Sequence, residues 1–445
     1  MIQAVILSTP ELGDRSYLLH DGEVGVAVDP QRDIDGMVAA AEAAGVRIAY
    51  VAETHIHNDY LSGGLSLARL LDVPYLVAAA EEVDFDRRPV HDGEEIAVGS
   101  GFAVRVVATP GHTPNHVSYV ALDRGRPVVA CTGGALLFGS VGRTDLSGDS
   151  LARSLAHQQF RSAHRLGQLP GSVSVLPTHG FGSFCSVGAS AAEASTIAEE
   201  REANLAFRAG DEGEFVDTLL AGFGDFPVYY HRMGPRNRRG VLPADLSDPP
   251  TVDLDQVSRL ARGESWVVDL RPRGVFAAAH LARTINVELD LPLATYLGWL
   301  LPESSPLVLM ADDAKSVSAA RLSLSRIGLE AVAGQCTGPV PPAGADPAVR
   351  TYPVRSFADL SDAMAQPGHV ALDVRRDDEW RAGHLDAAVH VPLQHLAERT
   401  GDLPPGTLWV HCAAGYRAAI AASLLQRAGR DVVLVDGRFT TPDRA

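Results

Sequence analysis

The sequence predicts a multidomain α/β protein, and three observations support that prediction. The chain has 445 residues, which is too many for one hydrophobic core. Residues 1–245 alternate short runs rich in Val and Ile with Gly- and Asp-rich turns and with helix-like stretches such as "DIDGMVAAAEAAGV". The C-terminal half contains one strand–loop–helix–strand pattern twice, which is typical of a duplicated α/β unit.

Two Pro-rich segments, 239–257 and 338–354, separate these regions and are typical of linkers. After each linker comes one copy of the repeat. "VVDLRPRGVFAAAHLARTINVEL" (267–289) aligns without gaps with "ALDVRRDDEWRAGHLDAAVHVPL" (371–393), so that an Asp-x-Arg and a His-Leu pair recur in both copies. We therefore expect three domains, with the bounds 1–245, 250–340 and 350–445.

Composition excludes several classes of partner. Hydrophobic residues make up 46% and charged residues 21% of the chain, which is usual for a globular protein. The net charge of −17 argues against nucleic acid and against an anionic membrane surface, because both require basic patches. We therefore expect small-molecule substrates, and whether the chain forms a homo-oligomer is left open.

The sequence also indicates a compartment. The first residues, "MIQAVILSTPELGDRSYLL", lack a basic start followed by a long apolar run, and the chain contains no apolar stretch long enough to span a bilayer. The four cysteines have no CxxC spacing. They are Cys131, Cys185, Cys336 and Cys412. Unpaired spacing in a long chain favours free thiols in a reducing compartment, so we expect a cytoplasmic protein.

The last copy of the repeat carries a candidate nucleophile. In "WVHCAAGYRAA", Cys412 directly follows an apolar strand, and a helix is expected to begin on the far side of a short loop. Backbone N–H groups at a helix N-terminus form a cradle for anions, and Arg417 adds a positive charge. Such a loop suits a thiolate or a persulfide. The alternative of an inert buried cysteine leaves Gly415 and Arg417 without a role.

The pattern Cys-x-x-Gly-x-Arg, preceded by "LDVRRDDEWRAGHL", resembles the rhodanese sulfurtransferase domain over residues 355–440. The resemblance implies that Cys412 carries a persulfide and that the loop up to Arg417 stabilises it. Phosphatase loops have one more residue before the arginine, so that reading ranks lower. In the middle copy Ala311 stands in place of Cys412, and Asp312 and Asp313 would repel an anion. We expect that copy to be a degenerate rhodanese domain without transferase activity.

A second set of residues, in the first domain, predicts a metal site. In "ETHIHNDY", His55, His57 and Asp59 are two residues apart, so their side chains project to one side of an extended backbone. His112 in "TPGHT" and His179 in "PTHG" follow later strands. Imidazoles together with a carboxylate suit zinc or ferrous iron. A single histidine of this kind would more often be a hydrogen-bonded loop residue, but the whole set favours metal binding.

These segments, with "TGGALLFGSVGRTDL", resemble the metallo-β-lactamase fold, an αββα sandwich, over residues 1–240, and come closest to its persulfide dioxygenase and glyoxalase II branches. The resemblance implies one ferrous ion held by two histidines, matching His55 and His112, and by an aspartate. At the aspartate position this chain has Gly134. Where the hydrolase branch has a further metal-binding histidine, the chain has Tyr60. Asp145 is a candidate replacement carboxylate.

Counting ligands favours a mononuclear site. Without a bridging carboxylate, a second cation would keep only Asp59 and His179, which is too few for tight binding. We therefore expect one Fe(II) per chain, with zinc as the alternative. His55, His57 and His112 are the expected main ligands, and Tyr60 lies beside them.

The whole chain resembles fusions of a persulfide dioxygenase with an inactive and an active rhodanese domain. The resemblance implies a low-molecular-weight thiol persulfide as substrate, and sulfite and thiosulfate as further reactants. Two alternatives remain open. One is a zinc thioester hydrolase of glyoxalase II type with a rhodanese attached. The other is a metal-poor first domain that binds a thiol, with only Cys412 active.

Overall fold

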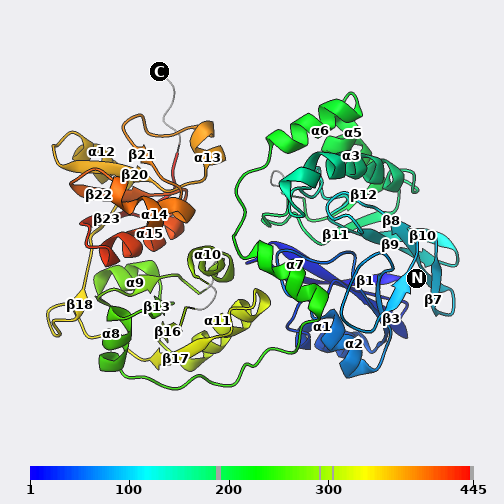
Figure 1. Cartoon of the computed structure of the whole chain (residues 1–445), viewed down its shortest axis with the longest axis horizontal. Coiled ribbons are helices and arrows are strands. Elements are labelled where there is room, and N and C mark those ends of the chain that lie inside the picture. The colour runs from blue at the N-terminus through cyan, green and yellow to red at the C-terminus, as the bar shows by residue number, and fades with distance from the viewer. Residues whose placement is uncertain (187–191, 290–291, 303–304, 441–445) are drawn as a thin grey trace. The chain divides into compact units, whose positions relative to one another are not determined.

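The computed structural model describes residues 1–186, 192–289, 292–302 and 305–440. It separates into two compact units: unit 1 comprises Met1–Asp245 with Ser325–Gly328, and unit 2 comprises Leu246–Leu324 with Leu329–Ala445. Both units mix helices and strands, so the predicted α/β class is confirmed (Figure 1). None of the helices that the structure describes combines the length and the apolar character that a membrane span requires.

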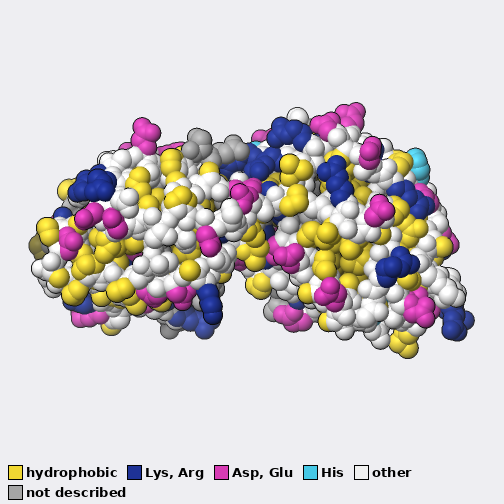
Figure 2. Space-filling view, turned by 90° about the horizontal axis from the view of Figure 1, so that it is seen from below, with side chains coloured by type: hydrophobic (Ala, Val, Ile, Leu, Met, Phe, Trp, Pro, Cys, Tyr) yellow, Lys and Arg dark blue, Asp and Glu magenta, His cyan; other side chains and the backbone are white. Residues whose placement is uncertain are grey.

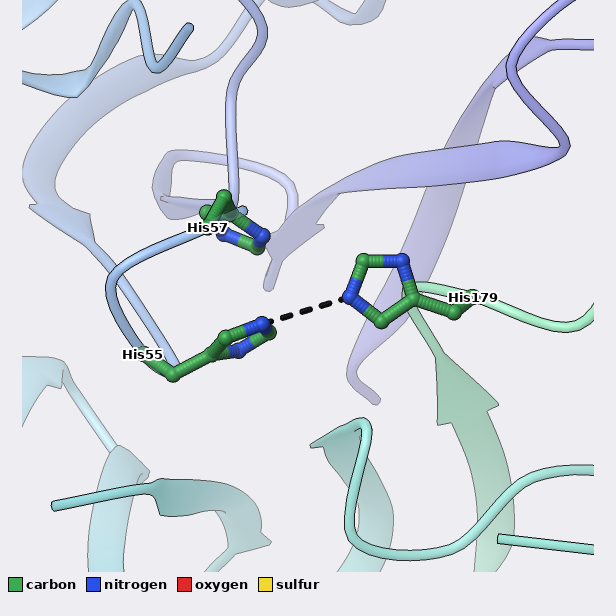
Figure 3. Close-up of side chains that lie close together, drawn as sticks. All are labelled: His55, His57 and His179. Atoms are coloured by element: carbon green, nitrogen blue, oxygen red, sulfur yellow. Dashed lines mark hydrogen bonds between the residues drawn. The ribbon is translucent and has the colours of Figure 1, made fainter. Parts of the chain in front are cut away.

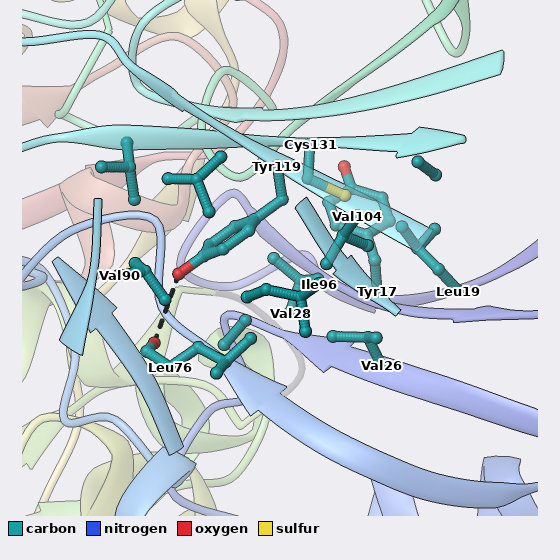
Figure 4. Close-up of a cluster of buried hydrophobic side chains, with 14 of the residues drawn as sticks. Tyr17, Leu19, Val26, Val28, Leu76, Val90, Ile96, Val104, Tyr119 and Cys131 are labelled. Carbon is teal, nitrogen blue, oxygen red and sulfur yellow. Dashed lines mark hydrogen bonds between the residues drawn. The ribbon is translucent and has the colours of Figure 1, made fainter. Parts of the chain in front are cut away.

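Unit 1 contains two six-stranded sheets packed face to face. The first sheet has the order β1 (Gln3–Thr9), β2 (Asp14–His20), β3 (Val24–Val28), β4 (Arg47–Ala52), β5 (Tyr75–Ala78) and β6 (Arg88–Val90). The second sheet has the order β12 (Ser195–Thr196), β11 (Ser174–Pro177), β10 (Arg126–Gly133), β9 (Val117–Asp123), β8 (Phe102–Ala108) and β7 (Glu95–Gly99). A core of buried side chains from both sheets, including Tyr17, Val28 and Tyr119, joins their inner faces (Figure 4).

Helices cover the outer faces of both sheets. Against the first sheet pack α1 (Asp35–Ala44) and α2 (Gly64–Leu71), whose apolar residues share a core with strands β2 to β5. Against the second sheet packs a group that consists of α3 (Asp149–Leu166), α4 (Ile197–Ala203), α5 (Leu205–Arg208) and α6 (Glu212–Ala221). The remaining helix of this part is α7 (Tyr230–Arg239). The helix–sheet–sheet–helix layering is the sandwich that the sequence predicts.

Unit 2 contains two largely parallel sheets that share one strand order. The first sheet runs β15 (Ile285–Asn286), β13 (Trp266–Asp269), β16 (Leu307–Ala311) and β17 (Val332–Thr337). The second sheet runs β21 (Val389–His390), β20 (His369–Asp373), β22 (Thr407–His411), β23 (Val432–Val435) and β19 (Val354–Arg355). A two-strand ribbon pairs β14 (His280–Leu281) with β18 (Val349–Arg350).

Helices accompany each of these sheets. Those of the earlier segment are α8 (Leu254–Arg262), α9 (Arg273–Ala278), α10 (Leu293–Leu300) and α11 (Ala314–Arg326). Those of the later segment are α12 (Phe357–Met364), α13 (Asp377–Ala382), α14 (Leu396–Arg399) and α15 (Tyr416–Arg427).

On the face that Figure 2 shows, acidic, basic and apolar side chains are interspersed.

The two segments of unit 2 repeat one set of local contacts. The Arg271 guanidinium donates to both oxygens of Asp269, with the Nη2–Oδ2 distance 2.6 Å. Arg375 forms the same fork on Asp373, also with 2.6 Å between Nη2 and Oδ2. In addition, His280 stacks on the phenylalanine four residues before it, as His384 stacks on Trp380. This shared geometry supports the duplication that the aligned segments predict.

Candidate functional site

The four predicted histidines lie together because each follows a strand that ends at the same edge of the sandwich. His55 and His57 follow β4, His112 follows β8 and His179 follows β11. All four side chains are buried. A ring nitrogen from each of His55, His57 and His179 lies within 4.8 Å of the other two (Figure 3).

The rings of His55 and His179 point at each other, with their Nε2 atoms 3.2 Å apart (Figure 3). The other nitrogen of each ring already has a partner. Thr54 Oγ1 donates its hydrogen to Asp29, so it accepts from His55 Nδ1 at 2.8 Å. His179 Nδ1 faces the carboxylates of Asp14 and Asp59 at 2.9 and 3.0 Å. Both Nε2 atoms are therefore left to share a proton or a cation between them.

His57 is oriented by two carboxylates. Its Nε2 lies 2.9 Å from Glu53 Oε2 and 3.4 Å from Asp29 Oδ1. Burial alone would lower the pKa of His57, but the negative charges of Asp29 and Glu53 raise it well above its usual value. Its Nδ1 atom is buried and has no hydrogen-bond partner among the described residues. That nitrogen can serve as a ligand when a cation takes the place of its proton.

His112 has the same one-sided pattern. Its Nδ1 donates to the backbone carbonyl of Arg143 at 2.7 Å, which leaves the lone pair on Nε2. Nε2 is buried, and the described residues offer it no hydrogen-bond partner. Burial and the nearby His179 lower the pKa of His112 to about 3, so the ring is neutral and can bind a metal ion.

Position 134, where the resembled family has an aspartate, leaves no room for a side chain. A Cβ on Gly134 would overlap the Cγ and Cδ2 atoms of His112 and would lie 3.0 Å from its Cβ. The Gly134 N–H donates to His116 Nε2 at 3.0 Å, and His116 Nδ1 lies 2.9 Å from Thr109 Oγ1. Both nitrogens of His116 thus have partners, one of them the backbone of Gly134, and the His116 ring stacks on that of His55.

Two carboxylates give this site negative charge. Asp14, at the start of β2, and Asp59 both contact His179 Nδ1, and the three residues form a further group with ligand atoms within 4.8 Å. Burial raises the pKa of Asp14 to about 7, with the charge of Asp59 as the next cause. Burial alone would raise the pKa of Asp59, but His179 holds this pKa below its usual value. Burial alone would lower the pKa of His179, yet the two carboxylates raise it to about 9.

Tyr60 and Asp145 are held by neighbouring residues. The Tyr60 hydroxyl donates to the carbonyl of Asp29 at 3.2 Å and lies 3.0 Å from His57 Nε2, and its ring stacks on His57. Both oxygens of Asp145 accept from the Arg143 guanidinium at 2.7 Å. Asp145 belongs to no metal-binding group found among the described residues. Tyr60 thus supplies a hydrogen bond beside the histidines, and Asp145 anchors Arg143.

The sequence interpretation did not single out several residues of this site. They are Asp14, Asp29, Glu53, His116 and Cys185. Glu53 and Asp29 carry a detectable signal, because each is an acidic residue at the end of an apolar strand in "VAVDP" and "YVAETH". Cys185 lies six residues after His179 in "THGFGSFC", and that short separation is the signal that could have pointed to it.

The arrangement fits a bound metal ion. Imidazole ligands in metal sites commonly donate their second nitrogen to a carboxylate, a carbonyl or a hydroxyl, which fixes the tautomer. His55, His57, His112 and His179 all do so. Two nitrogens 3.2 Å apart are also consistent with neighbouring ligands of one ion, given metal–nitrogen bonds of roughly 2.0–2.1 Å. These histidines are therefore residues that could hold a metal ion.

The second candidate site is the cysteine loop of unit 2. Cys412 directly follows β22 and is buried, and its thiol is free. Gly415, with φ of 88°, turns the chain into α15. A side chain at Gly415 would overlap the carboxylate of Asp436, so this position requires glycine for space as well as for backbone conformation. The predicted order of strand, loop and helix is present.

The arginine of this loop is not a free cation. Arg417 forms two hydrogen bonds with Glu379 of α13, at 2.5 Å from Nη1 and 2.7 Å from Nη2. Burial alone would raise the pKa of Glu379, but Arg417 holds it below its usual value. Arg417 therefore neutralises a carboxylate beside the loop, a role that the sequence interpretation did not include.

The middle copy packs on the loop-bearing copy within unit 2. Asn286 N donates to Ser423 Oγ of α15 at 3.0 Å, and His280 Nε2 lies 2.6 Å from Gln426 Oε1 of the same helix. Where the last copy has Cys412, the middle copy ends β16 at Ala311. Ala311 and Asp312 line a cavity of about 150 Å³. Asp313 accepts from Ser316 N at 2.8 Å, so its carboxylate lies at the start of α11.

Comparisons with known proteins identify families that this chain resembles. A family model described as "Rhodanese-like domain" matches residues 356–441. The human protein "Persulfide dioxygenase ETHE1, mitochondrial" is 33% identical over 195 residues, which is 42% of this chain and 69% of the relative. "Hydroxyacylglutathione hydrolase" of Brucella anthropi is 28% identical over 250 residues, which is 53% of this chain and 92% of the relative.

A solved structure has the same fold. The crystal structure described as a metallo-beta-lactamase from Staphylococcus aureus has a TM-score of 0.67 and 27% identity, and it covers 76% of this chain and 99% of its own. That share is larger than unit 1, so the likeness extends into unit 2.

The sandwich with its buried histidines and the cysteine loop define a metallo-β-lactamase-fold protein that also carries a rhodanese domain. More particularly, the chain belongs to the persulfide dioxygenase family within that fold, as its identity to the human and bovine members shows. The resemblance predicted from the sequence is confirmed at the level of these two families.

Proposed function

We propose that the chain is a bifunctional sulfur enzyme. Unit 1 oxidises a low-molecular-weight thiol persulfide with dioxygen, and Cys412 in unit 2 transfers sulfane sulfur. The observation that carries the proposal is the pair of facing Nε2 atoms of His55 and His179, 3.2 Å apart among imidazoles whose other nitrogens are engaged. The persulfide dioxygenases among the chain's relatives, together with the rhodanese-like domain, support the same conclusion.

The oxidation balances without a further reductant. A persulfide RSSH, one dioxygen and one water give the thiol RSH and sulfurous acid, which ionises to sulfite. The sulfur–sulfur bond breaks, the outer sulfur is oxidised and the dioxygen is reduced. The thiol carrier R is a small molecule, and glutathione and coenzyme A are both candidates.

We infer that the cluster holds one metal ion, with ligands drawn from His55, His57, His112 and His179. Ferrous iron is the favoured metal and zinc the alternative, because neutral imidazoles suit both. When bound, ferrous iron supplies the activation of dioxygen and a binding position for the substrate's sulfur.

The surrounding residues prepare these imidazoles. The carboxylates of Glu53 and Asp29 lie 2.9 and 3.4 Å from His57 Nε2 and thereby orient the ring, which leaves its Nδ1 for the cluster. Thr54 does the same for His55 through Nδ1. The buried carboxylates of Asp14 and Asp59 offset the positive charge that a cation brings into a buried site.

In unit 2 the proposed chemistry is a sulfur transfer without net oxidation. A lone pair of sulfite attacks the outer sulfur of the Cys412 persulfide. The bond between the two sulfur atoms breaks, Cys412 leaves as a thiolate, and thiosulfate forms. The sulfite that unit 1 produces is thus an acceptor for unit 2. Arg417 keeps Glu379 from repelling these anions.

One observation favours a second candidate, a dinuclear zinc thioester hydrolase. Asp14, Asp59 and His179 form a group that could hold a second cation, and Asp14 was not counted in the sequence interpretation. Hydrolases are also among the relatives. Against this reading, Gly134 offers no bridging carboxylate, and Tyr60 is hydrogen-bonded to His57 and Asp29.

An aerobic assay tests the proposal. Iron-loaded full-length protein carrying Cys412→Ser, which cannot consume sulfite, is mixed with glutathione persulfide or coenzyme A persulfide while dioxygen and sulfite are both followed. We expect one sulfite per dioxygen consumed with at least one carrier. The matched control is the same variant with His55→Ala added. Release of thiol from S-lactoylglutathione without dioxygen uptake would favour the hydrolase instead.

A further inference from the structure

We propose that Cys185 is a metal ligand and supplies the anionic donor that position 134 lacks. The inference rests on the proposed metal ion, and it concerns which residue completes the site. A ring nitrogen of His112, a ring nitrogen of His179 and the sulfur of Cys185 all lie within 4.8 Å of one another. His179 also belongs to the group with His55 and His57, so its ring joins the two groups.

The Cys185 side chain is enclosed. Its exposed fraction is 0%, and its thiol is free. Its neighbour His112 presents a buried Nε2 atom that has no hydrogen-bond partner in the described part of the chain. A buried nitrogen with an unused lone pair is costly unless a proton donor or a metal ion meets it. A shared metal ion satisfies His112 Nε2 and the sulfur together.

One residue positions both proposed ligands. The Arg143 N–H donates to the carbonyl of Cys185 at 2.9 Å, and the Arg143 carbonyl accepts from His112 Nδ1 at 2.7 Å. The Arg143 guanidinium adds a hydrogen bond to the Phe184 carbonyl at 3.2 Å and is itself held by Asp145. The backbone of Arg143 therefore fixes Cys185 and His112 relative to each other. This is the role that the structure gives to Asp145.

A Cys185 thiolate carries the same single negative charge as the carboxylate that position 134 lacks. The family's site pairs histidines with one anionic carboxylate, and at that position a side chain is excluded by the His112 ring. A thiolate restores one negative charge from a different loop. A cysteine binds a metal ion as the thiolate, so a cation bound to the sulfur takes the place of the thiol proton. Thiolate ligands suit both zinc and ferrous iron.

Cobalt substitution tests this assignment without relying on activity. Full-length protein is freed of metal by chelation and titrated anaerobically with Co²⁺, and the near-ultraviolet absorption from thiolate-to-cobalt charge transfer is recorded. We expect that band in the wild type and in two matched controls, Cys131→Ser in the core of unit 1 and Cys412→Ser in unit 2. We expect its loss in Cys185→Ser, with Co²⁺ bound at least about 10- to 100-fold more weakly, since losing a mere outer-shell partner of a ligand already costs that much.

A second measurement keeps the test independent of the variant's folding. X-ray absorption of the zinc-loaded wild type should show one sulfur neighbour at roughly 2.3 Å from zinc. Stoichiometric metal binding with neither the charge-transfer band nor a sulfur neighbour would refute the role of Cys185 and leave the proposed metal site standing. Failure of the wild type to bind Co²⁺, Zn²⁺ or Fe²⁺ would refute both. A band that persists in Cys185→Ser would also overturn the assignment.

Discussion

The imidazole of His112 occupies the space beside Gly134, so that no side chain fits at position 134 while the ring keeps its place. The backbone at this point is fixed as well, because the Gly134 N–H donates to His116 Nε2. The loss of the family's aspartate is therefore built into the packing of this chain. The packing at this position therefore depends on His112 and His116 together.

This packing makes a prediction about restoring the carboxylate. Gly134→Asp should lower the iron content of the purified protein instead of improving it, because the new side chain must displace His112. The steric cost is comparable to overpacking a core, roughly 1–3 kcal/mol. Metal analysis and thermal unfolding of unit 1 followed by circular dichroism would measure both effects. Gly36→Asp is the matched control, because a Cβ at this position in the first turn of α1 would lie 3.6 Å from Leu7 Cδ2, an ordinary van der Waals contact. A Gly134→Asp protein with full or increased iron content would contradict the packing argument.

The cysteine loop gives a second prediction. Cys412→Ser should abolish sulfur transfer from thiosulfate to cyanide while the metal content of unit 1 stays unchanged. Full transferase activity in this variant would place the nucleophile elsewhere.

The Arg417–Glu379 pair gives a third. Arg417→Ala should reduce kcat/KM for anionic sulfur donors by roughly 10- to 100-fold, since losing a charged hydrogen-bond partner costs about 1.5–3 kcal/mol. The physical cause is the uncompensated carboxylate of Glu379. The double variant Arg417→Ala with Glu379→Gln should regain part of this loss, because the repelling charge is gone. If the double variant is no better than Arg417→Ala alone, neutralising Glu379 is not what Arg417 does.

The middle copy offers a negative prediction. Ala311→Cys should not create a second sulfurtransferase in a Cys412→Ser background, because Asp312 remains beside the new thiol and disfavours an anion. Transfer to cyanide is the measurement, and Ala311→Cys with Asp312→Ala is the comparison variant. Robust activity from the single change would show that the carboxylates are not what silences this copy.

A buried histidine beside the nucleophile predicts how the stability of unit 2 depends on pH. Burial lowers the pKa of His411 to about 4, although Asp373 opposes the shift. The unfolded state, with an ordinary pKa near 6.5, therefore binds a proton first as the pH falls. Stability is complete above about pH 6.5 and is lost progressively down to about pH 4, by up to about 3 kcal/mol.

Urea unfolding followed by tryptophan fluorescence can measure this effect, because all four tryptophans lie in unit 2. They are Trp266, Trp299, Trp380 and Trp409. His411→Phe keeps a ring between Phe357 and Phe439 and should flatten the pH dependence. Equal slopes for the wild type and this variant between pH 4 and 6.5 would assign the effect to other groups.

Much of the site was predictable because it depends on local spacing. Strand ends bring residues to one edge of a sheet, so His55, His57, His112 and His179 could be grouped from the sequence. The cysteine loop was predictable for the same reason, since a strand, a glycine and a helix follow one another directly.

The remaining contacts depend on packing between distant segments, which a single sequence does not reveal. Arg417 of α15 pairs with Glu379 of α13, although 38 residues separate them along the chain. His112 fills the space beside Gly134 because two loops converge there. Asp14 contacts His179 although 165 residues separate the two along the chain. Spacing identifies residue types that can bind a metal, but the nitrogen that each ring offers depends on partners such as Glu53 and Arg143.

The most direct test of the account is the metal content of the full-length chain after iron-replete expression and anaerobic purification. We predict one equivalent of iron per chain, lost in His55→Ala and in His179→Ala and retained in His91→Ala, whose side chain is exposed. Two equivalents of tightly bound zinc would contradict the account in favour of a dinuclear hydrolase. No bound metal of any kind would contradict it in favour of a chain in which only Cys412 is active.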